Sequence, residues 1–524
     1  MPNLKIDDID VHVPDGTTIL EAAKTAGIHI PHFCYHASLK IIATCRVCLV
    51  EVENTPKLQT ACSTEVRDGM IVSTKNPRVQ KARRAVLEFL LINHPLDCPV
   101  CDQAGECDLQ DYVFDYGAAE SRYVEEKRRY PRQDIGSKIV RDMNRCVHCT
   151  RCVRFCRDVI GIEEYGVFER GARTTVGTYI DKTLENNYQG SLVELCPVGA
   201  LTSRDFRFKA RVWRLNSAES VCPGCSRGCN VLIDFKDQTV YRFRARQNDD
   251  VNGRWLCDEG RMSYAFVNDS NRILDPLHKV DGQNKQVDLD DGLSSIGEIL
   301  RKITDEHGPD SVGGIASSSC TNEENYLFAK FFREVLGSKN IDFIPAGRGE
   351  GSSDAFLIQA DKSPNSRGAE EMGCRGEGLD VERMMSAARQ GKLKALFVMG
   401  QDVIDRFPEK NLVKEALSAL ELLVVQDTNM NGTAALAHFV LPKASFAEMD
   451  GTFTNFEGRV QRIRPAFRHE DVLPGCMTIS ALVRKMGHDY GYSSASDVFD
   501  EIARKVQRYK GLSYDKIGNQ GVKI

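Results

Sequence analysis

Residues 145–156, RCVHCTRCVRFC, decide the fold class of the part of the chain around them. Four thiols in this stretch have the C-x2-C-x2-C-x3-C spacing of bacterial ferredoxins: Cys146, Cys149, Cys152 and Cys156. In such a run the first three thiolates bind one [4Fe–4S] cluster, and the fourth binds a neighbouring cluster. The spacing therefore predicts a ferredoxin-like fold that holds at least one four-iron cluster.

A further thiol, Cys196, precedes Pro197 and offers the missing fourth ligand of that cluster. At the matching spacing before Cys196, where a second cluster would have its ligands, stand Leu192, Gln189 and Asn186. A two-cluster ferredoxin has therefore lost one cluster here. We expect Cys196 to complete the remaining four-iron site and Cys156 to stay unbound. The alternative, in which Cys156 is the ligand and Cys196 is idle, remains open.

Basic side chains surround the motif: Arg145, Arg151, Arg154 and Arg157. Two roles fit them. They could favour the reduced cluster electrostatically, or they could form a solvated or partner-facing rim, which is the commoner role of a charge run.

A second group of thiols lies nearer the N-terminus: Cys34, Cys45, Cys48 and Cys62. Two short strands within residues 4–13 and a helix that begins at the capping box Thr18-x-x-Glu21 and ends at Gly27 precede it. This order opens a β-grasp ferredoxin domain, and four thiolates there suit a [2Fe–2S] cluster. The first gap differs from the plant-type spacing, and four cysteines also suit zinc.

A third group combines a histidine with three thiols: His94, Cys98, Cys101 and Cys107. Asn76-Pro77 predicts the start of a helix that leads to it. The apolar positions expected to pack inward on that helix are Val79, Ala82, Val86, Phe89 and Leu90. Because Pro95 ends the helix directly before the thiols, we interpret His94 as the fourth ligand of a [4Fe–4S] cluster; a satisfied bystander histidine is the alternative.

A fourth group has the spacing C-x2-C-x3-C-x27-C: Cys222, Cys225, Cys229 and Cys257. Two strands, VLIDF at 231–235 and TVYRFRA at 239–245, lie between its third and fourth members. A zinc ribbon and a [4Fe–4S] cluster both fit this spacing.

After residue 270 the pattern changes to alternating helices and apolar strands, which predicts an α/β domain with a parallel sheet. Helices are expected near 291–305, 322–336, 379–391 and 497–509, and strands near 311–316, 395–399 and 422–425. The cysteines of this region, Cys320, Cys374 and Cys476, are isolated and are interpreted as structural. Gly347-x-Gly349-x-Gly351 lacks the dinucleotide spacing and is interpreted as an ordinary glycine loop.

The composition limits the remaining classes of function. Nineteen cysteines without a recognisable export signal argue for metal ligation and against disulfides. No run approaches the roughly 20 apolar residues of a membrane helix, so we expect a soluble chain with no direct membrane span. The net charge is −5 and no basic tract is interleaved with aromatics, so no nucleic-acid partner is expected.

The motifs together resemble the large iron–sulfur subunit of respiratory complex I, the 75 kDa family of NADH–quinone oxidoreductase. The segments that carry the resemblance are HFCYH, TCRVCLVEV, NHPLDCPVCDQAGECDLQD, RCVHCTRCVRFC and ELCPVGAL. Residues 441–463 and 363–373 resemble the molybdopterin oxidoreductases, as the back half of this family does. The fourth cysteine group resembles the cluster at the start of those enzymes.

The resemblance implies one [2Fe–2S] and three [4Fe–4S] clusters, no molybdopterin, and no catalytic acid, base or nucleophile on this chain. Cys374 in GCRGEG does not match a molybdenum ligand motif. The expected domains are 1–76 ([2Fe–2S] ferredoxin-like), 77–118 (His/Cys3 [4Fe–4S]), 136–214 ([4Fe–4S] ferredoxin-like), 215–271 (molybdopterin-oxidoreductase-type [4Fe–4S]) and 272–524 (truncated molybdopterin-oxidoreductase-like).

The resemblance also implies a role and partners. The chain would relay electrons from an NADH-oxidising FMN and iron–sulfur subunit and its [2Fe–2S] partner to a two-cluster ferredoxin-like subunit, and so towards quinone. Other peripheral-arm subunits of complex I would surround it, on the cytoplasmic side of a bacterial inner membrane. An NAD-linked formate dehydrogenase with molybdenum or tungsten, or the electron-entry subunit of an NAD-linked hydrogenase, is the alternative.

Overall fold

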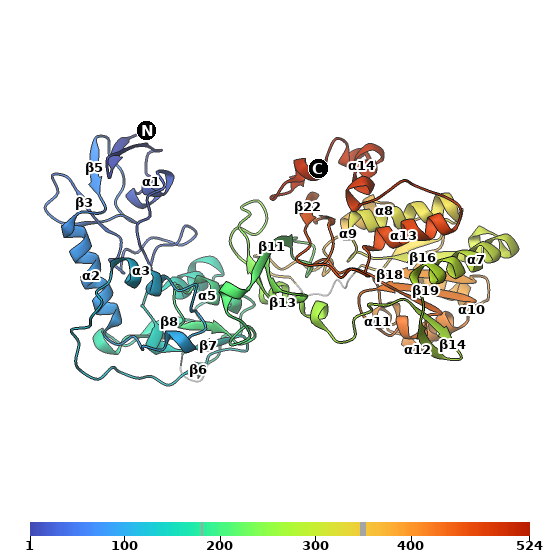
Figure 1. Ribbon diagram of the computed structural model, residues 1–524, viewed down its shortest axis with the longest axis horizontal. Helices are drawn as coiled ribbons and strands as arrows, with labels where there is room; N and C mark the ends of the chain where they lie inside the picture. Colours follow the sequence, from blue (N-terminus) through green and yellow to red (C-terminus); the bar gives the residue numbers. More distant parts are fainter. Residues whose placement is uncertain (180–181, 346–352) are drawn as a thin grey trace. The chain divides into compact units, whose positions relative to one another are not determined.

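The computed structural model describes residues 1–179, 182–345 and 353–524. The chain divides into two compact units, Met1–Leu215 and Asn216–Ile524 (Figure 1). The expected boundary at 214/215 lies next to this division. The other domain boundaries stay predictions. The glycine loop at 347–351 lies outside the described residues.

The first unit opens with a small mixed sheet in the order β2-β1-β5-β3-β4. Its elements are β1 (Asn3–Ile6), β2 (Ile9–His12), α1 (Ile19–Thr25), β3 (Leu49–Val52), β4 (Gln59–Thr60) and β5 (Met70–Ser73). The strands β1 and β5 are parallel, as in a β-grasp fold, and the other pairs are antiparallel. Half of the expected capping box forms: the Thr18 hydroxyl accepts from the Glu21 amide, whereas the Glu21 carboxylate bonds Lys24 and Tyr35.

The helix α2 (Pro77–Leu91) begins where the sequence predicts, and Asn76 caps it by accepting a hydrogen bond from the Val79 amide at 2.9 Å. Its buried stripe consists of Val79, Arg83 and Leu87, four residues apart. The expectation that Phe89 packs inward is wrong, since 73% of that residue is exposed. Phe89 lies two residues beyond Leu87, about 200° around the helix, so it leaves the buried stripe. The helix α3 (Asp108–Tyr116) packs against α2.

Short elements build the ferredoxin-like part of this unit. They are β6 (Gln133–Asp134), β7 (Ile139–Arg141), α4 (Arg151–Arg154), β8 (Gly166–Phe168), β9 (Thr175–Gly177), α5 (Gln189–Leu195) and β10 (Leu201–Ser203). The order β10-β7-β6 forms one antiparallel sheet, and β8 pairs with β9. The helix α4 continues into a π-helical turn at Phe155–Val159.

The second unit starts with an antiparallel sheet of β11 (Asn216–Val221), β12 (Asn230–Lys236) and β13 (Thr239–Ala245), followed by α6 (Asp258–Met262). The two strands expected between Cys229 and Cys257 are therefore present. They bring these two distant cysteines back to the same end of the sheet.

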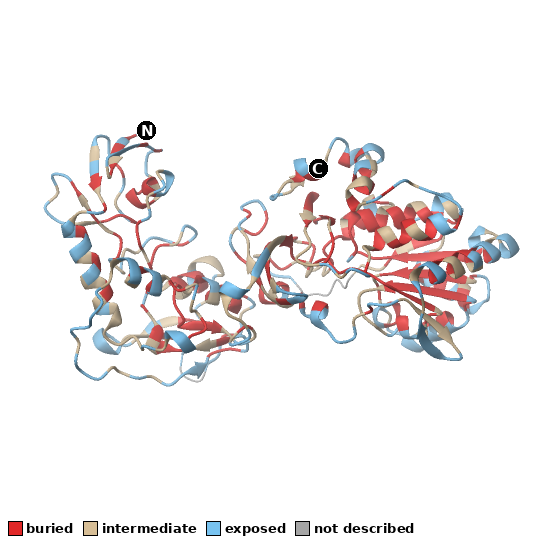
Figure 2. Cartoon of the chain, in the orientation of Figure 1, coloured by how far each residue is buried: buried red, intermediate tan, exposed pale blue. Residues whose placement is uncertain are grey.

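A seven-stranded sheet with helices on both faces makes up most of the second unit (Figure 1). Its strands, in the order β15-β14-β20-β19-β18-β16-β17, are β14 (Leu277–Val280), β15 (Gln283–Gln286), β16 (Val312–Ala316), β17 (Ile341–Phe343), β18 (Ala395–Met399), β19 (Leu422–Asp427) and β20 (Phe439–Pro442). The five strands β16, β17, β18, β19 and β20 are parallel to one another, as the alternating pattern predicts. Burial on both faces explains their continuous apolar runs (Figure 2).

Two helical layers cover this sheet. One packs Phe397 of β18 against α7 (Leu289–His307), α8 (Asn322–Lys330) with its π-helical turn Phe331–Val335, α13 (Gly475–Lys485) and α14 (Ala495–Lys505). The other packs Val398 against α10 (Val381–Arg389), α11 (Val403–Arg406) and α12 (Lys410–Ser418). Alternate strand residues thus serve opposite layers. The remaining α-helices and strands are α9 (Ser366–Glu371), β21 (Gly451–Thr454), β22 (Arg459–Ile463), α15 (Tyr514–Ile517) and β23 (Val522–Lys523).

Candidate iron–sulfur sites

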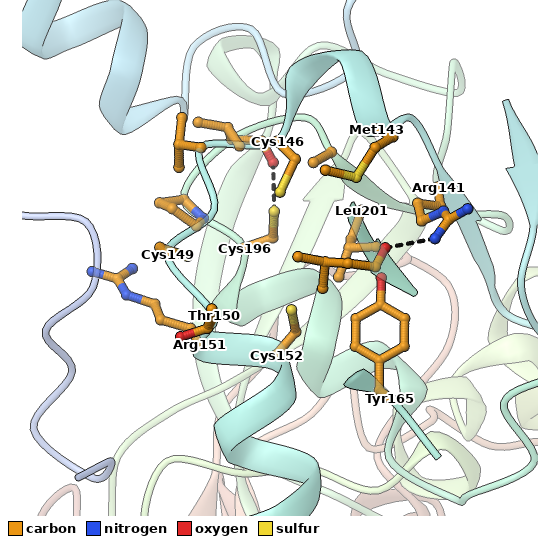
Figure 3. Close-up of a pocket in the computed structure, with 15 residues that line it drawn as sticks. Arg141, Met143, Cys146, Cys149, Thr150, Arg151, Cys152, Tyr165, Cys196 and Leu201 are labelled. Carbon is orange, nitrogen blue, oxygen red and sulfur yellow. Dashed lines mark hydrogen bonds between the residues drawn. The ribbon is translucent and has the colours of Figure 1, made fainter. Parts of the chain in front are cut away.

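The thiols predicted to hold the ferredoxin-like cluster line one cavity (Figure 3). They are Cys146, Cys149, Cys152 and Cys196. Two of these residues lie in the loop before α4, one lies on α4, and Cys196 ends α5. Their surroundings are largely apolar, and burial raises the pKa of the Cys196 thiol to about 12. A thiol in such surroundings becomes a thiolate only when a cation is bound beside it, so the donor set fits an iron cluster.

The backbone around these thiols is shaped to reach them. The His148 amide donates a hydrogen bond to the Cys146 sulfur at 3.4 Å, and the Cys196 thiol donates to the Val198 carbonyl at 3.0 Å. His148 and Thr150 both have left-handed φ angles, of 51° and 55°. These angles fold the loop tightly around the space between the sulfurs. Amide donors of this kind stabilise negative charge on a cluster.

The remaining cysteine of the motif, Cys156, is not among the described residues that line this cavity. It lies in the π-helical turn and is fully buried. Burial first, and then the nearby Glu164, raise the pKa of its thiol to about 12. This placement favours Cys196 as the fourth ligand, as the sequence predicts.

The four N-terminal thiols contact one another directly. Cys34 lies near enough to Cys45 and Cys62, and Cys48 near enough to Cys62, for each of these thiols to shift the pKa of its neighbour. The Phe33 amide donates to the Cys45 sulfur at 3.4 Å. The structure therefore gathers all four predicted ligands into one sulfur group, in which Cys45 is half-buried and the other three are buried. This donor set fits a two-iron cluster.

The thiols of the histidine-containing group are less enclosed. Cys98 is exposed, whereas Cys101 and Cys107 are buried. Burial raises the pKa of the Cys107 thiol to about 11 and lowers the pKa of His94 to about 4. A neutral imidazole carries the lone pair that a metal ligand needs. After burial, the largest effects on the pKa of His94 come from Asp97, which raises it, and from Arg145, which lowers it. Ligation of a cluster by His94 stays a prediction.

A glycine connects this group with the ferredoxin-like site. Gly199 follows Cys196 by three residues, and a Cβ atom there would lie 2.5 Å from the Cys101 sulfur. Only glycine leaves room for that sulfur.

The thiols of the first unit share one apolar core. A single cluster of buried side chains contains Cys34, Cys107 and Cys149, which belong to three different sites. Cys45, Cys146 and Cys196 pack against it. Three of the four candidate sites therefore adjoin the same water-excluding region.

Of the two roles considered for the four arginines, the solvated or partner-facing rim is wrong for three of them. Arg145, Arg151 and Arg154 are 2%, 9% and 2% exposed. Only Arg157 is exposed, beside Asp158 at 2.8 Å. Loops more than 100 residues earlier in the chain cover Arg151 and Arg154, and their carbonyls accept the guanidinium hydrogens.

The fourth group of thiols lies wholly in the second unit. Cys222, Cys225, Cys229 and Cys257 are buried. Burial first, and then the nearby thiols of Cys222, Cys225 and Cys257, raise the pKa of Cys229. The Gly224 amide donates to the Cys222 sulfur at 3.4 Å, and the Gly260 amide donates to the Cys257 sulfur at 3.3 Å. A Cβ atom at Gly260 would lie 3.0 and 3.2 Å from these two sulfurs. The donor set fits a four-thiolate cluster.

The isolated cysteines of the second unit, Cys320, Cys374 and Cys476, are each buried, and the Cys374 thiol donates to the Asn325 carbonyl at 3.4 Å.

Two residues that line the ferredoxin-like cavity, Tyr165 and Arg141, could not be found from the spacing of the sequence. No helix in the described ranges combines the length and apolar character needed to cross a membrane. No group of three or more His, Cys, Asp or Glu side chains among the described residues has the arrangement that a single metal ion needs.

Family models match along most of the chain. In chain order they are a 2Fe-2S iron-sulfur cluster binding domain (2–77), the NADH-ubiquinone oxidoreductase-G iron-sulfur binding region (83–122), the NADH-quinone oxidoreductase subunit 3 ferredoxin-like domain (136–202), the molybdopterin oxidoreductase Fe4S4 domain (215–269) and molybdopterin oxidoreductase (361–469). The chain is therefore an iron–sulfur protein with both 2Fe–2S and 4Fe–4S binding domains, joined to a molybdopterin-oxidoreductase-type domain.

Curated relatives narrow this class. The second G-type subunit of NADH-quinone oxidoreductase of Rhizobium meliloti is 28% identical over 99% of this chain and 84% of its own length. The G-type subunit of the Rickettsia felis enzyme is 40% identical over 65% of this chain and 50% of its own length. The 75 kDa subunit of NADH-ubiquinone oxidoreductase of Reclinomonas americana is 41% identical over 65% and 48%. The alignments with the last two span about half of each relative. The chain is thus similar to the G-type, or 75 kDa, subunits of NADH–quinone oxidoreductase.

Proposed function

We propose that this chain is an electron-relay subunit of an NADH–quinone oxidoreductase. The observation that carries the proposal is the shared core of the first unit, which contains thiols from three candidate sites. Clusters that adjoin one apolar region lie close together and are shielded from water. Iron–sulfur clusters bound there would accept and release electrons one at a time.

The ligands that we assign form four sets. The [2Fe–2S] site consists of Cys34, Cys45, Cys48 and Cys62, and the [4Fe–4S] sites consist of His94 with Cys98, Cys101 and Cys107, of Cys146, Cys149, Cys152 and Cys196, and of Cys222, Cys225, Cys229 and Cys257. The mutual contacts of the first set and the cavity of the third support this assignment most directly. The chain's own part in the reaction is to hold these groups, exclude water and donate amide hydrogen bonds to sulfur.

The fourth site has a different role in this proposal. Its thiols belong to the second unit and pack outside the core that the other three sites share. As the family resemblance implies, we assign the histidine-containing and ferredoxin-like clusters to the main electron path, and the fourth cluster to a structural role off that path. No molybdopterin is assigned to the second unit.

The partners follow from the role. An NADH-oxidising FMN and iron–sulfur subunit, with its [2Fe–2S] partner, would deliver electrons. A two-cluster ferredoxin-like subunit would carry them on towards quinone. Other peripheral-arm subunits would complete the surroundings, with the whole assembly peripheral on the cytoplasmic side of a bacterial inner membrane.

Reduction by NADH in the native complex tests this function. The complex is purified anaerobically, and the electron paramagnetic resonance signals of the clusters are followed after NADH is added and again after quinone is added. The proposal predicts that NADH produces signals of one two-iron and at least two four-iron clusters on this chain, and that quinone removes them. Clusters that dithionite reduces but NADH does not would contradict a relay role.

A further inference from the structure

Arg154 lies between two of the candidate cluster sites. Its guanidinium donates to the carbonyl of Cys34 in the [2Fe–2S] site and, at 3.3 Å, to the carbonyl of Cys149 in the ferredoxin-like site. It also donates to the carbonyl of Lys40 at 2.6 Å, in the loop between Cys34 and Cys45. One side chain thus fixes the ligand loop of one site against the ligand loop of another.

This arginine is also a buried charge without an ionic partner. It is 2% exposed, and in the described part of the chain it forms no ion pair with a carboxylate. Neighbouring acids are engaged elsewhere: Asp158 pairs with Arg157, and Asp108 lies 3.9 Å from Arg151. An arginine keeps its proton at any ordinary pH, so a full positive charge remains between the two sulfur groups.

Buried positive charge of this kind acts on both sites at once. Reduction of a cluster adds one negative charge, and a nearby cation inside a low-dielectric core stabilises the product more than it would in water. Hydrogen bonds and net charge around a cluster are among the factors that set its potential. The effect on the two sites must be of the same sign, because the same guanidinium faces both.

We propose that Arg154 is a positioning residue that holds the [2Fe–2S] site and the ferredoxin-like site together, and that its unpaired charge raises the reduction potential of both clusters. This inference rests on the proposed function, since it requires clusters at these sites. It goes further by assigning one non-ligand side chain to the tuning of two clusters.

Four forms of the full chain in its native complex test the inference: wild type, Arg154→Gln, Arg154→Lys and Arg157→Gln. Iron and acid-labile sulfide are measured first, and the midpoint potentials of both clusters are then obtained by redox titration with electron paramagnetic resonance. In Arg154→Gln we expect both midpoints to become more negative, each by at least a tenfold change in the reduction equilibrium, which is 59 mV for a one-electron couple. Arg157→Gln, the same change on an exposed and paired arginine, is expected to leave both midpoints within that range.

Arg154→Lys separates charge from shape. Lysine keeps the positive charge but lacks the planar fork that reaches several carbonyls, so we expect midpoints within tenfold of wild type. If Arg154→Gln assembles no clusters, unchanged midpoints in Arg154→Lys support the inference, and midpoints lowered by more than tenfold overturn it. Unchanged midpoints in Arg154→Gln, or a shift in only one cluster, also overturn it. A wild-type chain without iron–sulfur clusters would instead refute the proposed function.

Discussion

The ammonium of Lys443 lies 3.2 Å from the carboxylate of Glu324, and both side chains are almost fully buried in the second unit. Glu324 also accepts hydrogen bonds from the Thr321 amide at 2.9 Å and from the Gly475 amide at 3.1 Å. The pair therefore joins α8, the start of α13 and the segment after β20. Burial alone would lower the pKa of Lys443, but nearby negative groups, including Glu324, raise it above its usual value.

Removal of one partner should leave a buried charge without compensation. We expect Lys443→Met to lower the free energy of unfolding of the second unit by about 3–5 kcal/mol. Amide hydrogen exchange of β18 and β19 measures this loss, because strand amides in a core exchange through global opening. Lys505→Met, at an exposed lysine of α14, is the matched control and should change little. Recovery of stability in the double variant Glu324→Gln/Lys443→Met would confirm that the uncompensated charge is the cause, and no recovery would refute it.

Glu323, next to this pair in sequence, should make the stability of the second unit depend on pH. Its carboxylate is buried among the Thr452 amide, the Thr452 hydroxyl and the Tyr514 hydroxyl, and burial raises its pKa to about 7. The folded state therefore binds a proton that the unfolded state has lost between about pH 4.5 and pH 7. Stability should fall as pH rises through this window, by about 3 kcal/mol in total.

Urea unfolding of the full chain between pH 5 and pH 8 checks this dependence. The relevant quantity is the slope of stability against pH in wild type minus the slope in Glu323→Gln, so that the absolute cost of the substitution cancels. Glu457→Gln, at an exposed carboxylate, should keep the wild-type slope. Equal slopes in wild type and Glu323→Gln would show that Glu323 does not titrate in this range.

Local sequence signals located many elements well. Asn76-Pro77 marks the first turn of α2, because an amide-accepting cap and a proline suit that position only. The run at 395–399 corresponds to β18 residue for residue, because a strand buried on both faces must be apolar throughout.

The buried arginines could not be predicted in this way. Two of the three carbonyls that accept from Arg154 are 114 and 120 residues earlier in the chain, so nothing near RCVRFC signals that these loops cover it. The same holds for Glu21, whose carboxylate bonds the side chain of Tyr35 in place of completing a capping box. Long polar side chains take their positions from tertiary neighbours, which spacing along the chain does not contain.

The choice between Cys196 and Cys156 can be tested by comparing two serine variants. Cys196 lines the ferredoxin-like cavity, whereas Cys156 lies in the adjoining π-helical turn. We expect Cys196→Ser to lose about four iron atoms per chain together with the resonance signal of that cluster. Cys156→Ser should retain both. The opposite pattern would reassign the fourth ligand to Cys156.

The separate roles proposed for the ferredoxin-like site and the fourth site can be tested by comparing one ligand variant of each. Cys152→Ser should abolish electron transfer from NADH to quinone, since it removes a ligand from a cluster on the proposed path. Cys225→Ser should mainly lower the amount of assembled complex, because its site belongs to the core of the second unit. Turnover per assembled complex distinguishes the two effects. Equal loss of turnover in both variants, with normal assembly, would contradict an off-path fourth site.

The metal content of the chain tests the central claim most directly. Anaerobically purified chain is analysed for iron, acid-labile sulfide, zinc, molybdenum and tungsten. Four clusters predict about 14 iron atoms per chain with matching sulfide, the total for one two-iron and three four-iron clusters, and no molybdenum or tungsten. Zinc in place of iron would contradict the electron-relay account, and stoichiometric molybdenum or tungsten would make the second unit a catalytic domain.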